Sequence, residues 1–301
     1  MLVSRLLLAV ACCTAITAES RDVYYQGALA PRSIGPTFDK GYLVVYDRDH
    51  KIDVYAPDGS PLYSVSAHVP KADWVNFENA AVDTDGTLAG AVACGRGNSI
   101  TGAEIVLFDR TGHQTAFFDT GEYRPTQTSF GPDHSIWVLG WKPPRKDREN
   151  RDYFILRNFS QEGKELGAYL PRSSFAPEPE PVISSIGSWK IRTTKERVGA
   201  FLYYANPLVK PGEGEVTQWI ETDLNGKETG RWDFRGDYYP LALTQSGALY
   251  GQGDGLAVFD RATNTWRPVP GMPDGHLLGA DGENLVFWLR GASTLRWVPA
   301  K

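Results

Sequence analysis

Cysteine is scarce in this chain: its 301 residues contain three, and two of them, Cys12 and Cys13, lie in an apolar N-terminal stretch. If that stretch is removed, only Cys94 remains, and one cysteine cannot form an internal disulfide. An exported protein of this composition must therefore be held together by its hydrophobic core. Cys94 lies in the alternating apolar segment LAGAVACG, which is typical of a small buried side chain and not of a reactive thiol.

Long hydrophobic runs are also missing beyond the N-terminal stretch, so we expect no transmembrane segment in the mature chain. The one apolar run, residues 6–18, follows Arg5 and ends in small residues, which is the pattern of a secretory signal peptide. We expect residues 1–18 to be cleaved and residues 19–301 to be exported as one domain, to the periplasm or the exterior. A retained anchor helix and a lipid attached at Cys12 are the alternatives.

Charge of one sign is not concentrated anywhere in the chain. There are 36 acidic residues against 31 lysines and arginines, which gives a formal net charge of −5. A mildly acidic protein has no general attraction for nucleic-acid phosphates or anionic lipids. The densest charged segment, residues 141–150, mixes both signs and is typical of a solvated insertion. We therefore expect no nucleic-acid partner.

Familiar catalytic signatures are missing as well. The sequence contains no HExxH, no GxSxG, no glycine-rich phosphate loop ahead of a helix, and no CxxC pair. The five histidines are scattered, and each is better interpreted as a surface turn residue than as a zinc ligand. These absences favour a protein that is not an enzyme, and an enzyme remains the alternative.

Short β-rich runs separated by Gly, Asp and Asn turns fill the chain, whereas helical periodicity is nearly absent. The hairpin KIDVYAPDGSPLYSV at residues 51–65 recurs as EIVLFDRTGHQTAFF at residues 104–118, and three later segments fit the same frame. Each copy has Gly or Asn at its turn, where a tight hairpin needs a positive φ. These turn residues are Gly59, Gly112, Gly163, Gly226 and Asn264.

A second hairpin accompanies each of these copies and occurs six times, roughly every 48 residues. Its turns fall at Gly41, Gly86, His134, Glu196, Gly247 and Gly282. Two hairpins make four strands, and this length is that of one propeller blade. The sequence thus predicts an all-β protein, a six-bladed β-propeller of four-stranded antiparallel blades. A β-sandwich pair or a β-helix is the alternative, but a sandwich does not require six similar units and β-helix coils are much shorter.

The last unit is one strand short, because the chain ends after residues 294–298. The segment DVYYQG, residues 22–27, precedes the first unit and has no partner there. We expect this N-terminal strand to complete the last blade and close the ring, which removes an exposed sheet edge. In its repeat spacing and hairpin pattern the chain resembles the secreted bacterial six-bladed propellers of the NHL and lactonase types.

Long variable segments are expected on one face of the propeller. Strands that run up and down place the second turn of each blade and the links between blades opposite the short glycine turns, and rigid scaffolds usually carry binding in such loops. For each aromatic residue there, packing at a blade junction is the alternative to binding. The candidate ligand-binding residues on this long-loop face are Trp74, Glu78, Asn79, Tyr123, Arg124, Gln127, Trp141, Tyr239 and His276.

The resemblance to lactonase-type propellers also implies a second possible function, with a divalent cation such as Ca²⁺ held by oxygen ligands at the channel mouth. Only Glu78 is a carboxylate among the residues expected to begin the innermost strands, so Asp237 or Asp274 would have to add a ligand. We therefore predict an exported recognition or scaffold propeller, without a cofactor, that binds a ligand or an envelope protein. A metal-dependent hydrolase with Glu78 as its first ligand is the alternative.

Overall fold

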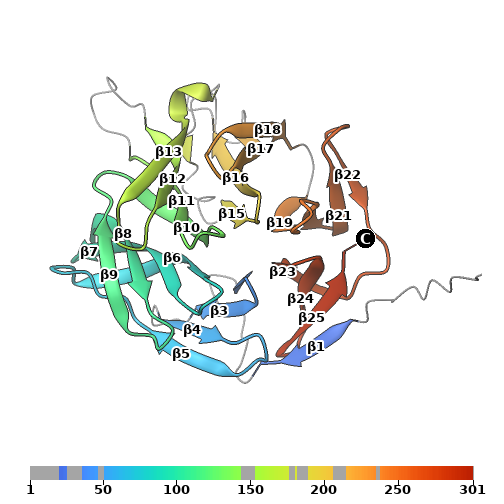
Figure 1. Ribbon diagram of the computed structural model, residues 1–301, viewed down its shortest axis with the longest axis horizontal. Coiled ribbons are helices and arrows are strands. Elements are labelled where there is room, and N and C mark those ends of the chain that lie inside the picture. Colours follow the sequence, from blue (N-terminus) through green and yellow to red (C-terminus); the bar gives the residue numbers. More distant parts are fainter. Residues whose placement is uncertain are drawn as a thin grey trace, which may run out of the picture.

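The computed structural model describes residues 20–25, 36–46, 51–143, 153–175, 180–181, 189–205, 215–234 and 238–300. Their strands form six antiparallel sheets arranged in a ring (Figure 1). This confirms the predicted six-bladed β-propeller. The one short helix described is η1, a 3₁₀ turn at Arg172–Ser174. No helix in the described residues is long and apolar enough to cross a membrane.

The sheets of blades 1 to 3 each contain four strands that follow chain order from the ring axis outward. Blade 1 contains β2 (Thr37–Asp39), β3 (Tyr42–Tyr46), β4 (Ile52–Tyr55) and β5 (Pro61–Val65). Blade 2 contains β6 (Trp74–Val82), β7 (Leu88–Arg96), β8 (Ser99–Phe108) and β9 (Gln114–Asp119). Blade 3 contains β10 (Arg124–Phe130), β11 (Ile136–Trp141), β12 (Phe154–Phe159) and β13 (Glu165–Pro171).

Blades 4 to 6 follow the same plan, with two variations. Blade 4 has two short strands on its inner edge, β14 (Glu180–Pro181) and β15 (Lys190–Thr193), followed by β16 (Arg197–Ala205), β17 (Glu215–Asp223) and β18 (Glu228–Asp233). Blade 5 contains β19 (Tyr239–Leu243), β20 (Leu249–Gly253), β21 (Gly255–Asp260) and β22 (Thr265–Pro268). Blade 6 contains β23 (Gly275–Asp281), β24 (Asn284–Leu289), β25 (Thr294–Pro299) and, from the N-terminal end, β1 (Arg21–Tyr24).

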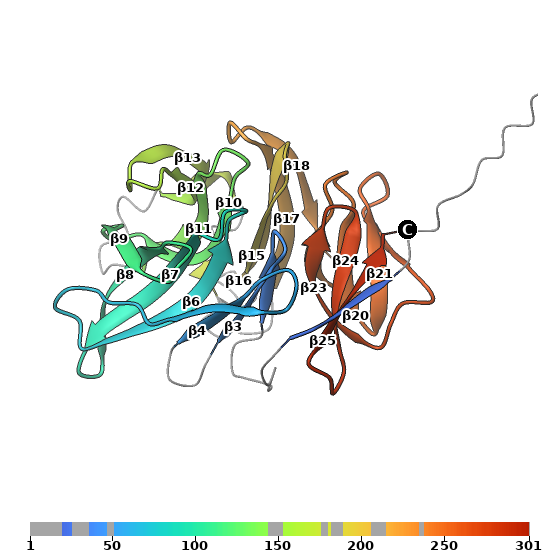
Figure 2. The same ribbon diagram turned by 60° about the horizontal axis from the view of Figure 1, so that its bottom comes forward.

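The N-terminal strand closes the ring as predicted. Strand β1 pairs antiparallel with β25 from Arg21 opposite Trp297 to Tyr24 opposite Thr294 (Figure 2). The following residue, Tyr25, is fully buried, and its ring lies edge-on to that of Tyr55 in blade 1, with centroids 5.8 Å apart. The closing strand therefore completes blade 6 and also fastens it to blade 1.

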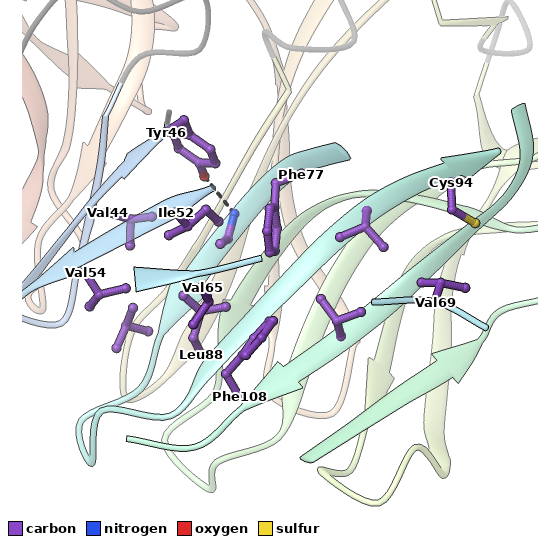
Figure 3. Close-up of a cluster of buried hydrophobic side chains, with 14 residues drawn as sticks. Val44, Tyr46, Ile52, Val54, Val65, Val69, Phe77, Leu88, Cys94 and Phe108 are labelled. Atoms are coloured by element: carbon purple, nitrogen blue, oxygen red, sulfur yellow. Dashed lines mark hydrogen bonds between the residues drawn. The ribbon is translucent and has the colours of Figure 1, made fainter. Parts of the chain in front are cut away.

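The hydrophobic core lies between neighbouring blades. Between blades 1 and 2, Ile52 and Val54 face Phe77 and Phe108 in one buried cluster (Figure 3). The Tyr46 hydroxyl of blade 1 accepts a 2.8 Å hydrogen bond from the backbone N–H of Ala80 in blade 2. Cys94 belongs to the same cluster and is buried, as its alternating segment predicts. Its pKa is raised by burial, which is the opposite of what a reactive thiol needs.

The predicted glycine turns have positive φ and also contact the preceding blade. Gly112, Gly163 and Gly226 have φ between +79° and +83°. A Cβ at Gly112 would lie 2.9 Å from Tyr63 Cβ, and one at Gly163 would lie 2.4 Å from the ring of Phe118. These positions therefore need glycine both for its backbone conformation and for the lack of a side chain. Gly59 and Asn264 also have positive φ, which confirms the repeat frame.

Replacing Gly163 with valine is expected to destabilise the fold more than the same change at Gly121. Both glycines have positive φ, but a Cβ at Gly121 meets no atom within 4 Å. The Gly121 variant should therefore lose about 1–3 kcal/mol of unfolding free energy from backbone strain alone. The Gly163 variant should lose that amount and the cost of displacing Phe118. Urea unfolding of both variants measures the difference, and equal losses would show that contact between blades adds nothing at this turn.

Candidate functional site

The innermost strands surround the ring axis, and four of those described have a β-bulge. The register shifts between Phe77 and Asn79 in β6, and at the corresponding points of β10, β19 and β23. Bulges re-aim a side chain and are common beside functional sites. The extra residues at the four bulges are Glu78, Thr126, Leu241 and Leu278. Only one of them is a carboxylate.

Arg192 of β15 connects three blades near the axis. Its Nε donates to the carbonyl of Leu241 at 3.0 Å, and its Nη2 donates to that of Leu278 at 3.4 Å. Both acceptors are bulge residues, so the guanidinium joins blade 4 to blades 5 and 6. Burial raises the pKa of Asp39 in blade 1, while the positive charges of Lys40 and Arg192 oppose that rise. The interior of the ring is therefore polar and charged.

A cavity of about 500 Å³ lies where β15, β19 and β23 begin. It shares Leu241 with the Arg192 contacts. Lys190 and Tyr239 are the first residues of β15 and β19, and His276 is the second residue of β23. The end of β20 adds Gln252 to the wall, and the β24–β25 turn adds Arg290. Strand starts and second turns lie on the long-loop face, so this pocket is at the channel mouth on that face.

The pocket has a positive lining. Lys190, His276 and Arg290 supply basic groups, and no described residue that lines it is acidic. Burial, with a smaller contribution from the positive charge of Arg192, lowers the pKa of Lys190 to about 8. Asp274 lies outside the lining, with its Oδ1 3.5 Å from Arg290 Nε, and both side chains are more than 70% exposed. Asp274 therefore offsets part of the Arg290 charge at the rim, and the described lining itself contributes only basic charged groups.

The wall between blades 5 and 6 is fixed by Gln252. Its Nε2 donates to the carbonyl of Gly275 at 2.7 Å, and its Oε1 accepts from the Leu277 N–H at 2.7 Å. Tyr239 forms the adjacent surface, with 50% of its area exposed and its ring edge-on to Phe201. The pocket therefore combines a rigid polar wall, basic groups and one accessible aromatic ring.

Tyr239 and His276 are the only two of the predicted site residues that line this pocket. The other seven lie in blades 2 and 3 or in the link between them. Arg124 lies over the ring of Trp141, with its guanidinium carbon 5.5 Å from the centroid. Half-buried Trp74 donates from Nε1 to the carbonyl of Gly97 at 2.9 Å. The structure thus divides the predicted residues between two regions of the ring.

Three of these residues have buried side chains. Tyr123 is fully buried, and its hydroxyl lies 2.9 Å from the carbonyl oxygen of Ile155. Asn79 Oδ1 accepts a 2.9 Å hydrogen bond from the Thr128 N–H and so joins blade 2 to blade 3. Gln127 is buried beside it on β10. The Asn79 contact therefore joins neighbouring blades, and the Tyr123 contact fixes the link between them to blade 3.

Glu78 is the carboxylate on which the predicted metal site depends. Solvent reaches its side chain, and the surrounding protein still raises its pKa by desolvation. Within the described ranges, no group of three or more His, Cys, Asp or Glu side chains is placed to hold a metal ion. Of the two other expected contributors, Asp237 lies outside the described residues, and Asp274 lies 3.5 Å from Arg290 Nε. The cation site therefore stays a prediction.

The predicted site residues did not include Lys190, Arg192, Gln252 and Arg290. Two of these four, Lys190 and Arg192, belong to β15, the short inner strand of blade 4. A signal was present: Lys190 and Arg192 are two residues apart, so in a strand they share a face. Two cationic residues on one face of a short inner strand indicate that an anion or a buried hydrogen-bond partner lies nearby.

Comparisons with known proteins identify no family: no family model and no curated protein matches this sequence. Among solved structures, the chain is similar to a gluconolactonase from Xanthomonas campestris, with a TM-score of 0.48 and 16% identity over 95% of this chain and 91% of that one. A protein of unknown function from Bacteroides caccae has a TM-score of 0.40 and 14% identity over 77% of this chain and 80% of its own.

Proposed function

We propose that this protein is an exported recognition propeller that binds a small organic anion in the pocket at its channel mouth. The observation that carries the proposal is the convergence of Lys190, His276 and Arg290 on one cavity whose described lining has no carboxylate. In a chain with a formal net charge of −5, such a positive site is a local exception. A volume of about 500 Å³ suits a small molecule.

The proposed binding mode follows from the chemistry of the lining. A ligand carboxylate accepts charge-assisted hydrogen bonds from Lys190 and Arg290, which are about twice as strong as neutral ones. The exposed ring of Tyr239 gives the carbon skeleton a flat apolar surface. Gln252 uses both ends of its amide to hold blades 5 and 6, so the wall is formed before a ligand arrives.

Replacing Lys190 with alanine is expected to weaken anion binding, and replacing Arg124 is the matched control. Losing one charge-assisted hydrogen bond of about 1.5–3 kcal/mol corresponds to roughly a 10- to 100-fold rise in Kd. Arg124→Ala removes a cation from the same face, but in blade 3, and should leave Kd unchanged. Isothermal titration of the purified protein with a panel of small mono- and dicarboxylates and phosphate esters measures both variants.

Two outcomes would contradict this proposal. If Arg124→Ala abolishes binding and Lys190→Ala does not, the ligand binds at the blade 2 and 3 residues instead. If Ca²⁺ raises the melting temperature and the Glu78→Gln variant loses that rise, the metal-dependent hydrolase is favoured, because a cation that binds only the folded state must stabilise it.

A further inference from the structure

We propose that Lys190 binds carbonyl-bearing anions, that is 2-oxo acids and aldehyde acids, covalently as a reversible imine. This inference rests on the proposed function and specifies its ligand. Lys190 is the only primary amine among the described residues that line the pocket. It comes from blade 4, whereas Arg290 and His276 come from blade 6. A carboxylate held by blade 6 therefore leaves the adjacent carbonyl carbon on the side of Lys190.

The placement of Lys190 follows from the geometry of β15. Residues two apart in a strand point to the same side, and Arg192 reaches the carbonyls of Leu241 and Leu278 across the ring interior. Lys190 therefore points from its strand toward the same interior, one step nearer to the mouth. The half-buried side chain has its base fixed by the pairing of Lys190 with Phe201 in β16.

Arg192 acts on Lys190 as a positioning residue. Its guanidinium is anchored by the Leu241 and Leu278 carbonyls, so its positive charge cannot move away when Lys190 is protonated. Burial and this neighbouring charge together bring the pKa of Lys190 to about 8. Relative to an ordinary lysine, the fraction of neutral amine at pH 7 is then larger by roughly two orders of magnitude. A neutral amine is the form that attacks a carbonyl.

The proposed reaction is a condensation that needs no oxidant or reductant. The nitrogen lone pair of Lys190 attacks the carbonyl carbon, and the carbonyl π electrons move to oxygen, which takes up a proton. The carbinolamine then loses this oxygen as water, after a second proton transfer, and the nitrogen lone pair forms the C=N bond. The amine supplies two protons to the departing water. The ligand carboxylate takes no part in bond making: the neutral Lys190 no longer pairs with it, and Arg290 and His276 hold it during the reaction.

Reductive trapping tests the inference directly. The purified protein is incubated at pH 7 with glyoxylate or pyruvate and sodium cyanoborohydride, and intact mass and peptide mapping locate any reduced adduct. We expect one adduct per chain at Lys190, formed at least about 10-fold faster than with acetaldehyde, which has no carboxylate for the basic groups to bind. The Lys190→Arg variant keeps the positive charge but cannot form the imine, and it should give no adduct at this pocket.

Each result bears on the inference, and calorimetry separates it from the proposed function. A single carboxylate-selective adduct that is lost in Lys190→Arg supports it. Adducts spread over many lysines, or equal rates for glyoxylate and acetaldehyde, would overturn it. If no adduct forms although glyoxylate still binds in titration, the imine is wrong and the anion site stands. If no small carboxylate binds the native protein at all, both proposals are wrong.

Discussion

A chain that begins at residue 26 is expected to lose several kcal/mol of unfolding free energy relative to one that begins at residue 19, although the deletion removes only the start of the fold. Strand β1 is the outermost strand of blade 6, and without it β25 becomes an unpaired edge. The deletion also removes buried Val23 and Tyr25 from the cluster between blades 6 and 1. Thermal and guanidinium unfolding, followed by circular dichroism, measure the loss.

Neighbouring tyrosines provide a matched test of the same closure by point substitution. Tyr25 is 0% exposed and Tyr24 is 65% exposed, so the two differ in burial but not in chemistry. Tyr25→Ala opens a cavity of aromatic size and should cost about 3–5 kcal/mol. Tyr24→Ala should stay within about 0.5 kcal/mol, as surface substitutions usually do. Equal effects at the two positions would show that the strand does not hold the ring closed.

The ring could be predicted from the sequence because the same turn residues recur at matching points of successive blades. Gly59, Gly112, Gly163 and Gly226 all have the positive φ that the turn frame requires, and so do most of the inner turns. Glu196 differs: it has no positive φ, and the Thr194 hydroxyl accepts hydrogen bonds from the Glu196 and Arg197 N–H groups in a turn that Thr194 N–H also closes to the Arg197 carbonyl. The turn therefore lies where the frame predicts, between β15 and β16, but its backbone conformation is different.

The candidate site was harder to predict, because the alternation of apolar and polar residues along a strand does not show which aromatic side chains pack between blades. Tyr123 is the last residue of the link between β9 and β10, and it is fully buried, with its ring against Gly140, where a Cβ would be 2.5 Å from it. Asn79 follows the bulge in β6 and uses its amide to hold Thr128 of the next blade. The burial of both side chains depends on the contacts that form when blades pack together, and a single sequence does not specify these contacts. Tyr239, the first residue of β19, packs edge-on to Phe201 and still keeps 50% of its area exposed.

The polar groups that face the axis differ from one side of the ring to the other, because the blades contribute different residues at their bulges. Blades 5 and 6 place Leu241 and Leu278 there, and their backbone carbonyls receive Arg192. Blade 2 places Glu78 at the corresponding point. The basic pocket therefore lies on the side of blades 4 to 6, while Glu78 lies on the other side of the ring. An anion site and a cation site would draw on different blades, so the two proposed functions can be separated by point substitutions.

Replacing Glu221 with glutamine is expected to cost about 1.5–3 kcal/mol of unfolding free energy, because two partly buried arginines lose the charged acceptor of their hydrogen bonds. The Glu221 side chain is 3% exposed in β17 and accepts hydrogen bonds from Arg197 Nη1 at 3.1 Å, Arg261 Nε at 3.1 Å and Trp219 Nε1 at 2.8 Å. Arg197 belongs to blade 4 and Arg261 to blade 5, so one carboxylate joins two blades. Glutamine keeps the shape but loses the charge and turns an N–H group toward these donors.

Glu228 in the neighbouring strand β18 gives the control, because it also pairs with an arginine but at the surface. Its carboxylate is 38% exposed and receives Arg231 Nη2 at 2.7 Å and Nε at 3.0 Å. An exposed pair of this kind contributes at most about 1 kcal/mol, so Glu228→Gln should change stability little. Urea unfolding of both variants in low and high salt completes the test, because salt screens the exposed pair and hardly affects the buried one. A small, salt-sensitive loss for Glu221→Gln would show that water reaches this carboxylate and that blades 4 and 5 are joined by apolar packing alone.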